Sequence, residues 1–272
     1  MRSDWTLSDA ERAAFDRDGF FIREAVFSDP ELKELREAAE RVAERAQRNA
    51  ADKREDDYSI DDNQYVEAGG STIQYEHQSG SETIRVIEPF HHLDPVFDRL
   101  IDDARLVEAM RGVVGSEQVA LWTDKINLKR PREGSGFRWH QDSPYWSHAC
   151  DHVDQLVNVM IALDDADEEN GCFRVIRGSH KGRYLPGLGD GSRLGPLFTD
   201  PRSFNEEDQV PAVVPAGSLV FFSAHTVHGS QPNRSDAARR ALVLTYQPGG
   251  QRMFKVDATR NAGEAESIRG VN

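Results

Sequence analysis

Residues 157–163 read VNVMIAL, a short apolar run dominated by residue types that favour β-strands. The run ends at Asp164-Asp165, which are typical of a turn. Similar runs occur from residue 119 onward, at residues 119–122, 126–128, 173–176, 219–222 and 241–246. Several short strands bounded by Gly, Pro, Asn and Asp predict a β-sandwich or barrel. The fold is therefore expected to be mainly β from about residue 116 to about residue 250.

The N-terminal part, about residues 1–115, has a helical pattern instead. Ser8 and Glu11 fit a capping box at the start of one helix. A short extended piece at 19–22 follows, and residues 28–30 (SDP) open a second helix with Pro in its first turn. The apolar stripe of this second helix consists of Leu32, Leu35, Ala39, Val42 and Ala43. Residues 94–115 predict a further helix.

Residues 49–82 are polar and rich in Asp, Gly, Ser and Gln. Long connections of this kind are often functional or disordered, so this segment predicts a long surface loop or a lid. No obvious linker and no internal repeat divides the chain. We therefore expect one domain over residues 1–272, with N-terminal helices packed against a β core.

The composition limits the possible partners. The formal net charge is −14 over 272 residues. Nucleic-acid binding needs clustered Lys and Arg, and an anionic membrane surface attracts basic segments, so both partners are disfavoured. No apolar stretch approaches the roughly 18 residues of a transmembrane helix, and the start shows no signal peptide. The two cysteines, Cys150 and Cys172, predict ordinary thiols. We expect a cytoplasmic monomer or homodimer that acts on a small molecule.

Two clusters of polar residues could carry chemistry. Residues 138–142 read RWHQD, and on an extended segment residues two apart share a face, so His140 and Asp142 would lie side by side. Residues 223–230 read SAHTVHGS. His225 and His228 would face opposite sides of a strand, so at most one of them joins His140 and Asp142 unless the segment turns. The spacing does not say which one.

Two His and one carboxylate form the facial triad of non-haem Fe(II) oxygenases, which leaves coordination positions open. A zinc site can use the same ligand types, so these residues alone do not decide the metal. A single His-x-Asp pair is also a weak signal, because such pairs occur often by chance.

Taken together, the motifs resemble the phytanoyl-CoA dioxygenase family, a branch of the Fe(II)/2-oxoglutarate oxygenases that includes ectoine hydroxylase. The matching segments span nearly the whole chain and lie at 15–20 (FDRDGF), 139–142 (WHQD), 162–165 (ALDD), 169–172 (ENGC), 178–180 (GSH) and 228–230 (HGS). The resemblance implies a double-stranded β-helix, the jelly roll also found in cupins. It also implies that His140, Asp142 and His228 bind Fe(II), because the distal His of the family precedes Gly-Ser.

The resemblance implies further contacts. Arg239 lies eleven residues past His228, at the position of the family's 2-oxoglutarate-binding Arg, with Ser230 beside it. A guanidinium matches a carboxylate in two parallel hydrogen bonds, which suits this role. Similarity to ectoine hydroxylase implies that Asn127 contacts 2-oxoglutarate and that Phe137 and Trp146 lie near the substrate. Arg240 would point to the other face of the strand, toward solvent or an acidic loop.

The implied reaction is the hydroxylation of a small molecule with 2-oxoglutarate and dioxygen, releasing succinate and CO2. Related halogenases lack a carboxylate at the position of Asp142, so its presence favours hydroxylation, desaturation or ring formation. We expect an amino-acid-like or natural-product substrate. Five arginines near the motifs could bind an acidic substrate or pair with nearby acids: Arg130, Arg132, Arg138, Arg174 and Arg177.

Two other classes of protein fit the residues alone. A zinc-type hydrolase or isomerase on a jelly roll would need no Arg at position 239. A non-catalytic β-sandwich binding protein would not need an intact triad. An Asp142→Ala variant separates these classes, because an enzyme loses turnover while a pure binding protein keeps its ligand affinity.

Overall fold

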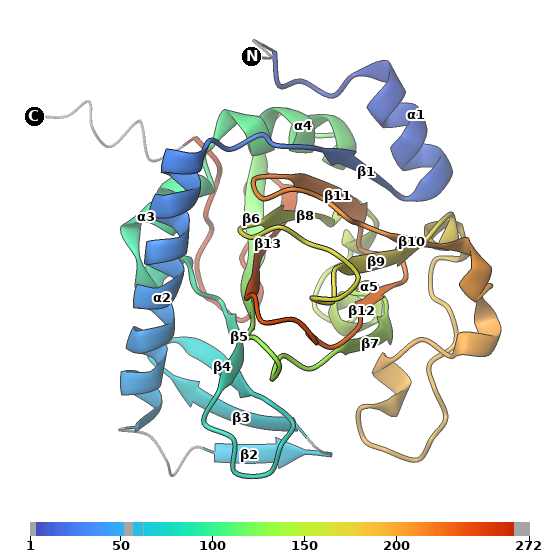
Figure 1. The fold of residues 1–272 in the computed structure, drawn as a ribbon. Coiled ribbons are helices and arrows are strands. Elements are labelled where there is room, and N and C mark those ends of the chain that lie inside the picture. The colour runs from blue at the N-terminus through green and yellow to red at the C-terminus, as the bar shows by residue number, and fades with distance from the viewer. Residues whose placement is uncertain (1–3, 52–56, 62, 264–272) are drawn as a thin grey trace, which may run out of the picture.

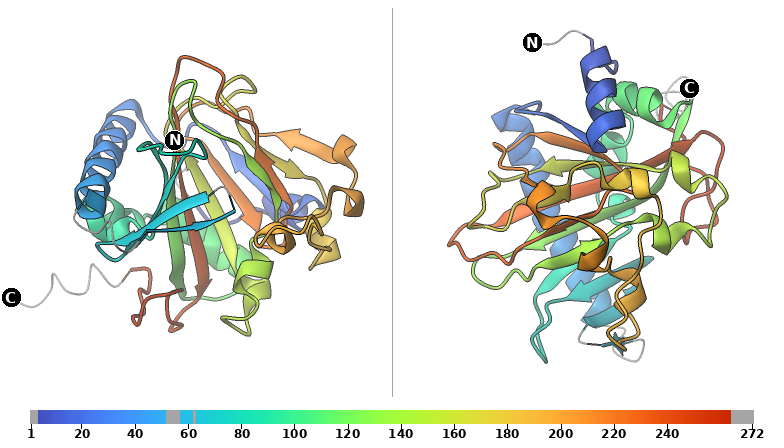
Figure 2. Two further views of the ribbon diagram at one scale, coloured as in Figure 1. Left: turned by 90° about the horizontal axis from the view of Figure 1, so that it is seen from below. Right: turned by 90° about the vertical axis from the view of Figure 1, so that its right-hand side faces the viewer.

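The computed structural model describes residues 4–51, 57–61 and 63–263. Within these residues the strands form two antiparallel sheets that face each other (Figures 1 and 2). The large sheet has the order β1 (Phe20–Arg23), β11 (Leu219–Ser223), β8 (Val157–Ala162), β13 (Arg239–Pro248), β6 (Val119–Lys129), β5 (Ile84–Glu88), β4 (Ser71–Tyr75), β3 (Asn63–Ala68) and β2 (Asp57–Ile60). The small sheet has the order β10 (Gln209–Pro211), β9 (Phe173–Ile176), β12 (His228–Ser230) and β7 (Phe137–His140). The predicted β architecture is therefore confirmed.

Helices α2 (Asp29–Ala51) and α4 (Ala104–Val114) cover the outer face of the large sheet, on the side away from the small sheet (Figure 2). The α-helices are α1 (Asp9–Asp18), α2 (Asp29–Ala51), α3 (Pro95–Leu100), α4 (Ala104–Val114) and α5 (Ser143–Trp146). Short 3-10 turns are η2 (His91–Leu93), η3 (Val153–Gln155), η4 (Ser179–Gly182), η5 (Gly195–Leu197), η6 (Pro201–Ser203) and η7 (Glu206–Asp208). No helix in the described part of the chain is long and apolar enough to cross a membrane. Cys150 and Cys172 are both free thiols.

Local signals set the first two helices. The Ser8 hydroxyl accepts from the Glu11 amide at 3.3 Å, and the Glu11 carboxylate accepts from the Ser8 amide at 2.8 Å, so the predicted capping box is present. Gly19 ends α1 with φ +86°, and a side chain there would come within 2.7 Å of the Thr226 hydroxyl. The chain can therefore turn at Gly19 directly into β1. The stripe predicted for α2 is buried, apart from the half-buried Ala43.

The strand register separates the two faces of the large sheet. Ile126, Leu242 and Ile161 pair across β6, β13 and β8 and belong to the core beneath the helices. Side chains alternate along a strand, so their neighbours Lys125, Asn127 and Lys129 on β6, and Arg239 on β13, share the opposite face. That face looks into the space between the sheets, where the functional residues gather.

Three sequence expectations were wrong in detail. Residues 57–75 hold strands β2 to β4 instead of a long loop; the remaining positions 52–56 and 62 lie outside the described residues. The sequence of these strands is polar because no helix in the described ranges covers one of their faces. On β2 and β3 the rings of Tyr58 and Tyr65 stack on each other. Residues 94–115 form two helices, because the Asp103 side chain caps a new one by accepting from the Arg105 amide at 2.9 Å.

The third correction concerns β6, which is one strand and not two runs. Thr123, Asp124 and Lys125 interrupt its apolar pattern, yet Thr123 and Asp124 are fully buried. Thr123 donates to Glu88, and Asp124 accepts from the His91 amide. In the sequence, these polar residues suggested that a strand ends at residue 122. They instead lie inside β6, where each has a hydrogen-bond partner.

Candidate metal centre

The small sheet brings His140, Asp142 and His228 together. His140 ends β7, His228 begins β12, and the two residues pair across these strands with ring centroids 4.1 Å apart. One ligand atom from each of the three side chains lies within 4.8 Å of the other two. Among the described residues, no other cluster of three or more His, Cys, Asp or Glu has this geometry.

Asp142 reaches this cluster by a different route from the one expected. It does not continue the strand but has helical backbone angles, φ −77° and ψ −30°, just before α5. The amides of Asp142 and Ser143 both donate to the Ala224 carbonyl at 3.0 Å, which holds the turn against the segment leading to β12. The prediction that His140 and Asp142 share one face of an extended segment was therefore wrong. The Asp142 carboxylate still lies beside His140.

His225 lies outside this cluster. Its Nε2 lies 2.8 Å from Asp154 Oδ1, and its ring packs against Tyr184. The chain turns between His225 and His228, so the two rings serve different surroundings. Of the two histidines that the spacing left open, His228 is the one placed at the cluster.

Both histidines are prepared for metal binding. His140 Nδ1 donates to the Arg138 carbonyl at 2.8 Å, and His228 Nδ1 donates to the Thr226 carbonyl at 2.9 Å. These bonds leave each Nε2 with a lone pair for a metal. Burial, with a smaller contribution from His228, lowers the pKa of His140 to about 3, and burial also lowers the pKa of His228. Both rings are neutral at physiological pH, as metal ligands must be.

Asp142 is held in its ionised form by its neighbours. Burial alone would raise the pKa of its carboxyl, but Lys125, the two histidines and a hydrogen bond from Asn158 lower it overall. Asn158 Nδ2 donates to Asp142 Oδ2 at 2.8 Å, and Asn158 Oδ1 accepts from the Thr245 hydroxyl at 2.6 Å. Lys125 Nζ lies 3.6 Å from Asp142 Oδ1. Two neutral imidazoles and one carboxylate suit a divalent ion such as Fe(II).

A cationic group of residues lies deeper between the sheets. Arg239 on β13 is 3% exposed and donates from Nη2 to the Gly171 carbonyl at 2.9 Å, while its buried Nε has no hydrogen-bond partner. Burial lowers the pKa of Arg239 to about 10. Lys129 pairs with Arg239 across the strands and donates to the Ser230 hydroxyl at 2.8 Å. Arg239 and Ser230 thus lie together, and Asn127 lies on the same face of β6.

The two aromatic residues expected near the substrate lie at different places. The Phe137 ring lies 4.2 Å from the Arg85 guanidinium and 5.8 Å from Lys129 Nζ, so it borders the cationic group. Trp146 on α5 is 2% exposed, and Lys125 Nζ lies 5.3 Å from its ring. Trp146 therefore borders the metal cluster through Lys125.

Most of the remaining arginines pair with acids. Arg130 binds Glu40, and the other ion pairs join Arg132 to Asp236, Arg138 to Asp190 and Arg174 to Glu168. Arg240 faces away from the cluster and binds Asp164 and Glu40, as expected for a neighbour on the opposite face. Of the two alternatives left open for the arginines, these contacts favour pairing with nearby acids.

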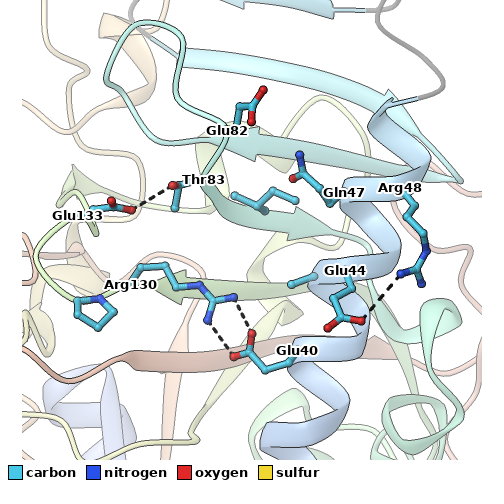
Figure 3. A pocket seen from close by; sticks show the side chains of 11 residues that line it. Glu40, Glu44, Gln47, Arg48, Glu82, Thr83, Arg130 and Glu133 are labelled. Atoms are coloured by element: carbon cyan, nitrogen blue, oxygen red, sulfur yellow. Dashed lines mark hydrogen bonds and ion pairs between the residues drawn. The ribbon is translucent and has the colours of Figure 1, made fainter.

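A groove lies between α2 and the ends of β5 and β6. Figure 3 shows that several of its charged and polar side chains pair with one another. Arg130 forms two hydrogen bonds with Glu40, Arg48 pairs with Glu44, and Thr83 donates to Glu133. It lies on the helical side of the large sheet, whereas the metal cluster lies between the sheets.

Sequence reasoning missed Lys125, Lys129 and Asn158. The only sequence signal for these residues is that each is a polar residue within an apolar strand run. A polar group buried there needs a hydrogen-bond partner, which can indicate a functional role. The sequence alone does not say which partners the strand register supplies.

Comparison with known proteins places the chain in a family. The family described as Phytanoyl-CoA dioxygenase (PhyH) matches residues 15–241. The chain belongs to the phytanoyl-CoA dioxygenase family. The ectoine dioxygenase of Bordetella bronchiseptica is 29% identical to this family member over 257 residues, which cover 88% of this chain and 75% of the relative. The L-proline trans-4-hydroxylase of Streptomyces griseoviridis is 27% identical over 252 residues, covering 86% of this chain and 84% of the relative.

Solved structures of family relatives share the fold. EctD from S. alaskensis with bound Fe has a TM-score of 0.65 and 26% identity, covering 94% of this chain and 81% of that one. EctD with 2-oxoglutarate and 5-hydroxyectoine has a TM-score of 0.68 and 24% identity, covering 93% and 80%. The predicted jelly roll of this family member is confirmed.

Proposed function

We propose that this protein is an Fe(II)- and 2-oxoglutarate-dependent dioxygenase that hydroxylates a small amino-acid-like or natural-product molecule. Two features that lie between the same sheets carry the proposal: a two-His, one-carboxylate cluster and a buried Arg239 whose Nε lacks a partner. A zinc-type hydrolase has no use for the second feature. The names of the relatives, an ectoine dioxygenase and an L-proline trans-4-hydroxylase, support the same class of reaction.

The residues fit the implied groups. His140, Asp142 and His228 would hold Fe(II) on one face, leaving the other positions for 2-oxoglutarate and dioxygen. Bound iron supplies the oxidative chemistry, and 2-oxoglutarate leaves as succinate and CO2. Arg239 and Ser230 would bind the distal carboxylate, because a buried charge needs a hydrogen-bonded partner. Asn127, on the same face of the sheet, is proposed as a further contact to 2-oxoglutarate.

The charges beside the metal cluster support a small polar substrate. Lys125 keeps about a quarter of its side chain exposed, and it lies between Asp142 and the Trp146 ring. Burial would lower the pKa of Lys125, but Glu88 and Asp142 raise it overall, so its ammonium group is charged. Glu88 is half-buried and accepts from the Thr123 hydroxyl at 2.9 Å. A cation and a carboxylate next to the reaction centre suit a substrate that carries both charges.

The first test needs no substrate. Under anaerobic conditions, Fe(II) and then 2-oxoglutarate are added to the metal-free protein, and the visible charge-transfer band of the chelate is recorded. The wild type is expected to show the band, His228→Ala to lack it, and Arg239→Ala to need far more 2-oxoglutarate. Arg240→Ala is the matched control, because Arg240 faces the acidic side of the same strand.

Iron binding without any charge-transfer band in the wild type would overturn the 2-oxoglutarate assignment. It would favour the zinc-type hydrolase or the binding protein.

A further inference from the structure

Three basic side chains meet at the inner end of the space between the sheets. Lys129 on β6 and Arg239 on β13 are directly paired, and they are 2% and 3% exposed. Both donate to one acceptor, the Gly171 carbonyl, at 3.3 and 2.9 Å. Arg85 on β5 is also buried and borders the same end, with the Phe137 ring between it and Lys129. Three basic groups are thus held close together in a region that excludes water.

The surroundings supply few countercharges. The remaining contacts of Lys129 are the Ser230 hydroxyl and the Gln231 carbonyl, both neutral. Glu76 acts electrostatically on Lys129 and Arg85, and Asp164 acts on Arg239, but neither acid forms an ion pair with these groups. One Glu76 oxygen accepts from Ser135, and the other has no hydrogen-bond partner. Among the described residues, no ion pair to Lys129, Arg239 or Arg85 is found. Buried charge of one sign without a partner is unfavourable, so this end is built for an anion.

The Gly171 carbonyl is fixed where it contacts both cations. Gly171 has φ +75°, and a Cβ there would come within 2.9 Å of Lys129 Nζ. A side chain at this position would therefore be strained and would push the ammonium away. The orphaned Nε of Arg239 remains as the open donor of the pair.

We propose that Lys129 is a second anchor for the distal carboxylate of 2-oxoglutarate, and that it takes up a proton when this carboxylate binds. The inference rests on the proposed function and adds a positioning residue to it. Arg239 presents a planar fork to the carboxylate, while Lys129 adds a compact point charge from the neighbouring strand.

Every group that faces Lys129 bears on its protonation. Burial, followed by repulsion from Arg239 on β13 and Arg85 on β5, lowers the pKa of Lys129 to about 6. Glu76, before β5, and Cys172, before β9, act weakly in the opposite direction. The free protein therefore holds Lys129 mostly neutral at pH 7.5. A bound carboxylate favours the ammonium form, so binding takes up a proton.

The protonation of Lys129 makes the affinity for 2-oxoglutarate depend on pH. The complex contains the protonated lysine, while the free protein loses that proton as the pH rises above about 6. Affinity for 2-oxoglutarate should therefore fall by about tenfold per pH unit between roughly pH 7 and pH 9. Both carboxylates of 2-oxoglutarate are already ionised in this range, so they contribute no such change.

Calorimetry of the metal-loaded protein tests the proposal. 2-Oxoglutarate is titrated anaerobically into the Fe(II)-loaded enzyme at pH 7.5, in two buffers with different ionisation enthalpies. The wild type should take up close to one proton per 2-oxoglutarate bound. Lys129→Met should bind about 10- to 100-fold more weakly at pH 6.5, take up no proton and lose the pH dependence. Arg130→Met is the control, because Arg130 pairs with Glu40 on the outer side.

Each outcome is decisive. Wild-type binding without proton uptake, or uptake that persists in a folded Lys129→Met protein, would overturn the role of Lys129 while leaving the proposed function intact. If Lys129→Met does not fold, the two-buffer measurement on the wild type decides alone. Absence of 2-oxoglutarate binding and of the charge-transfer band would instead overturn the proposed function itself.

Discussion

At the residue scale, the proposed metal centre is supported by side chains outside the three candidate ligands. Asn158 sits at a strand position where an apolar residue would be expected, yet it is fully buried and hydrogen-bonded at both ends of its amide. The Thr245 hydroxyl is bound to the Asn158 oxygen, so the amide nitrogen faces Asp142. This arrangement orients the carboxylate before metal arrives. Such supporting contacts commonly change metal affinity by about 10- to 100-fold.

Asn158→Ala should therefore weaken Fe(II) binding by about 10- to 100-fold. Thr245→Val should have a smaller effect, because the amide keeps its bond to Asp142 but loses the contact that fixes its orientation. Both affinities can be measured by anaerobic competition with a metal-binding dye. An unchanged iron affinity in a folded Asn158→Ala protein would show that Asp142 is positioned by its backbone turn alone.

At the scale of the elements, a buried acid joins two consecutive strands. Asp124 on β6 is fully buried, and its Oδ1 accepts from the amides of Phe90 and His91 at 2.6 and 2.8 Å. Its Oδ2 lies 2.7 Å from His91 Nδ1. Burial would lower the pKa of His91, but Asp124 raises it overall. The pair therefore fixes the chain where it leaves β5 and begins η2.

Asp124→Ala should destabilise the protein by about 3–5 kcal/mol, because it leaves buried donors without an acceptor. At about 2–4 °C per kcal/mol, the melting temperature should fall by roughly 6–20 °C. Thermal unfolding followed by circular dichroism measures this. Asp236→Ala is the control, because the exposed Arg132–Asp236 pair should contribute little. Equal melting temperatures for the two variants would refute the structural role of Asp124.

The contribution of His91 to the stability of the fold depends on pH. A histidine whose pKa is raised on folding adds stability below its unfolded pKa of about 6.5. That contribution is lost as the pH rises through the folded-state value. The wild type should therefore lose more stability on this rise than His91→Gln, as measured by unfolding in denaturant at a series of pH values. Parallel pH profiles for the two proteins would contradict this.

The elements also show how far the sequence carries a prediction. The helices α1 and α2 were predictable because a capping box and an apolar stripe are local signals. Strands β7 and β12 were not, since FRWH and HGS reflect the metal cluster more than a sheet. His140, Asp142 and His228 were found through motifs. Lys129 and Asn158 were missed, because their partners lie on strands that are distant in sequence and meet only through the register.

At the scale of the whole molecule, the distribution of charge resolves an apparent conflict. A chain with a net charge of −14 should repel an anionic co-substrate. Basic groups without an ion-pair partner among the described residues instead gather between the sheets, where Arg85, Lys129 and Arg239 lie. At the surface, acids and bases pair with each other, as Arg132 does with Asp236. The local field at the site can therefore oppose the overall charge.

The proposed metal ligands and the proposed 2-oxoglutarate anchors belong to different sheets. Metal and 2-oxoglutarate should therefore stabilise the fold jointly. The three proposed metal ligands come from β7, the turn before α5, and β12, all associated with the small sheet. Arg239 and Lys129 belong to the large sheet. A metal alone would join segments that are already paired. A molecule that chelates the metal and reaches Arg239 would connect one sheet to the other.

Mn(II) and 2-oxoglutarate together should therefore raise the melting temperature by more than the sum of their separate effects. A ligand at a hundred times its dissociation constant adds about 2.7 kcal/mol, or roughly 5–10 °C for a chain of this size. Differential scanning calorimetry under anaerobic conditions measures the melting temperature of the protein alone, with Mn(II), with 2-oxoglutarate and with both. Asp142→Ala should remove the joint effect, because the metal is lost. A shift from 2-oxoglutarate that is the same with and without metal would mean that it binds the cationic end without chelating the ion, and the two sheets would then not be joined through the metal.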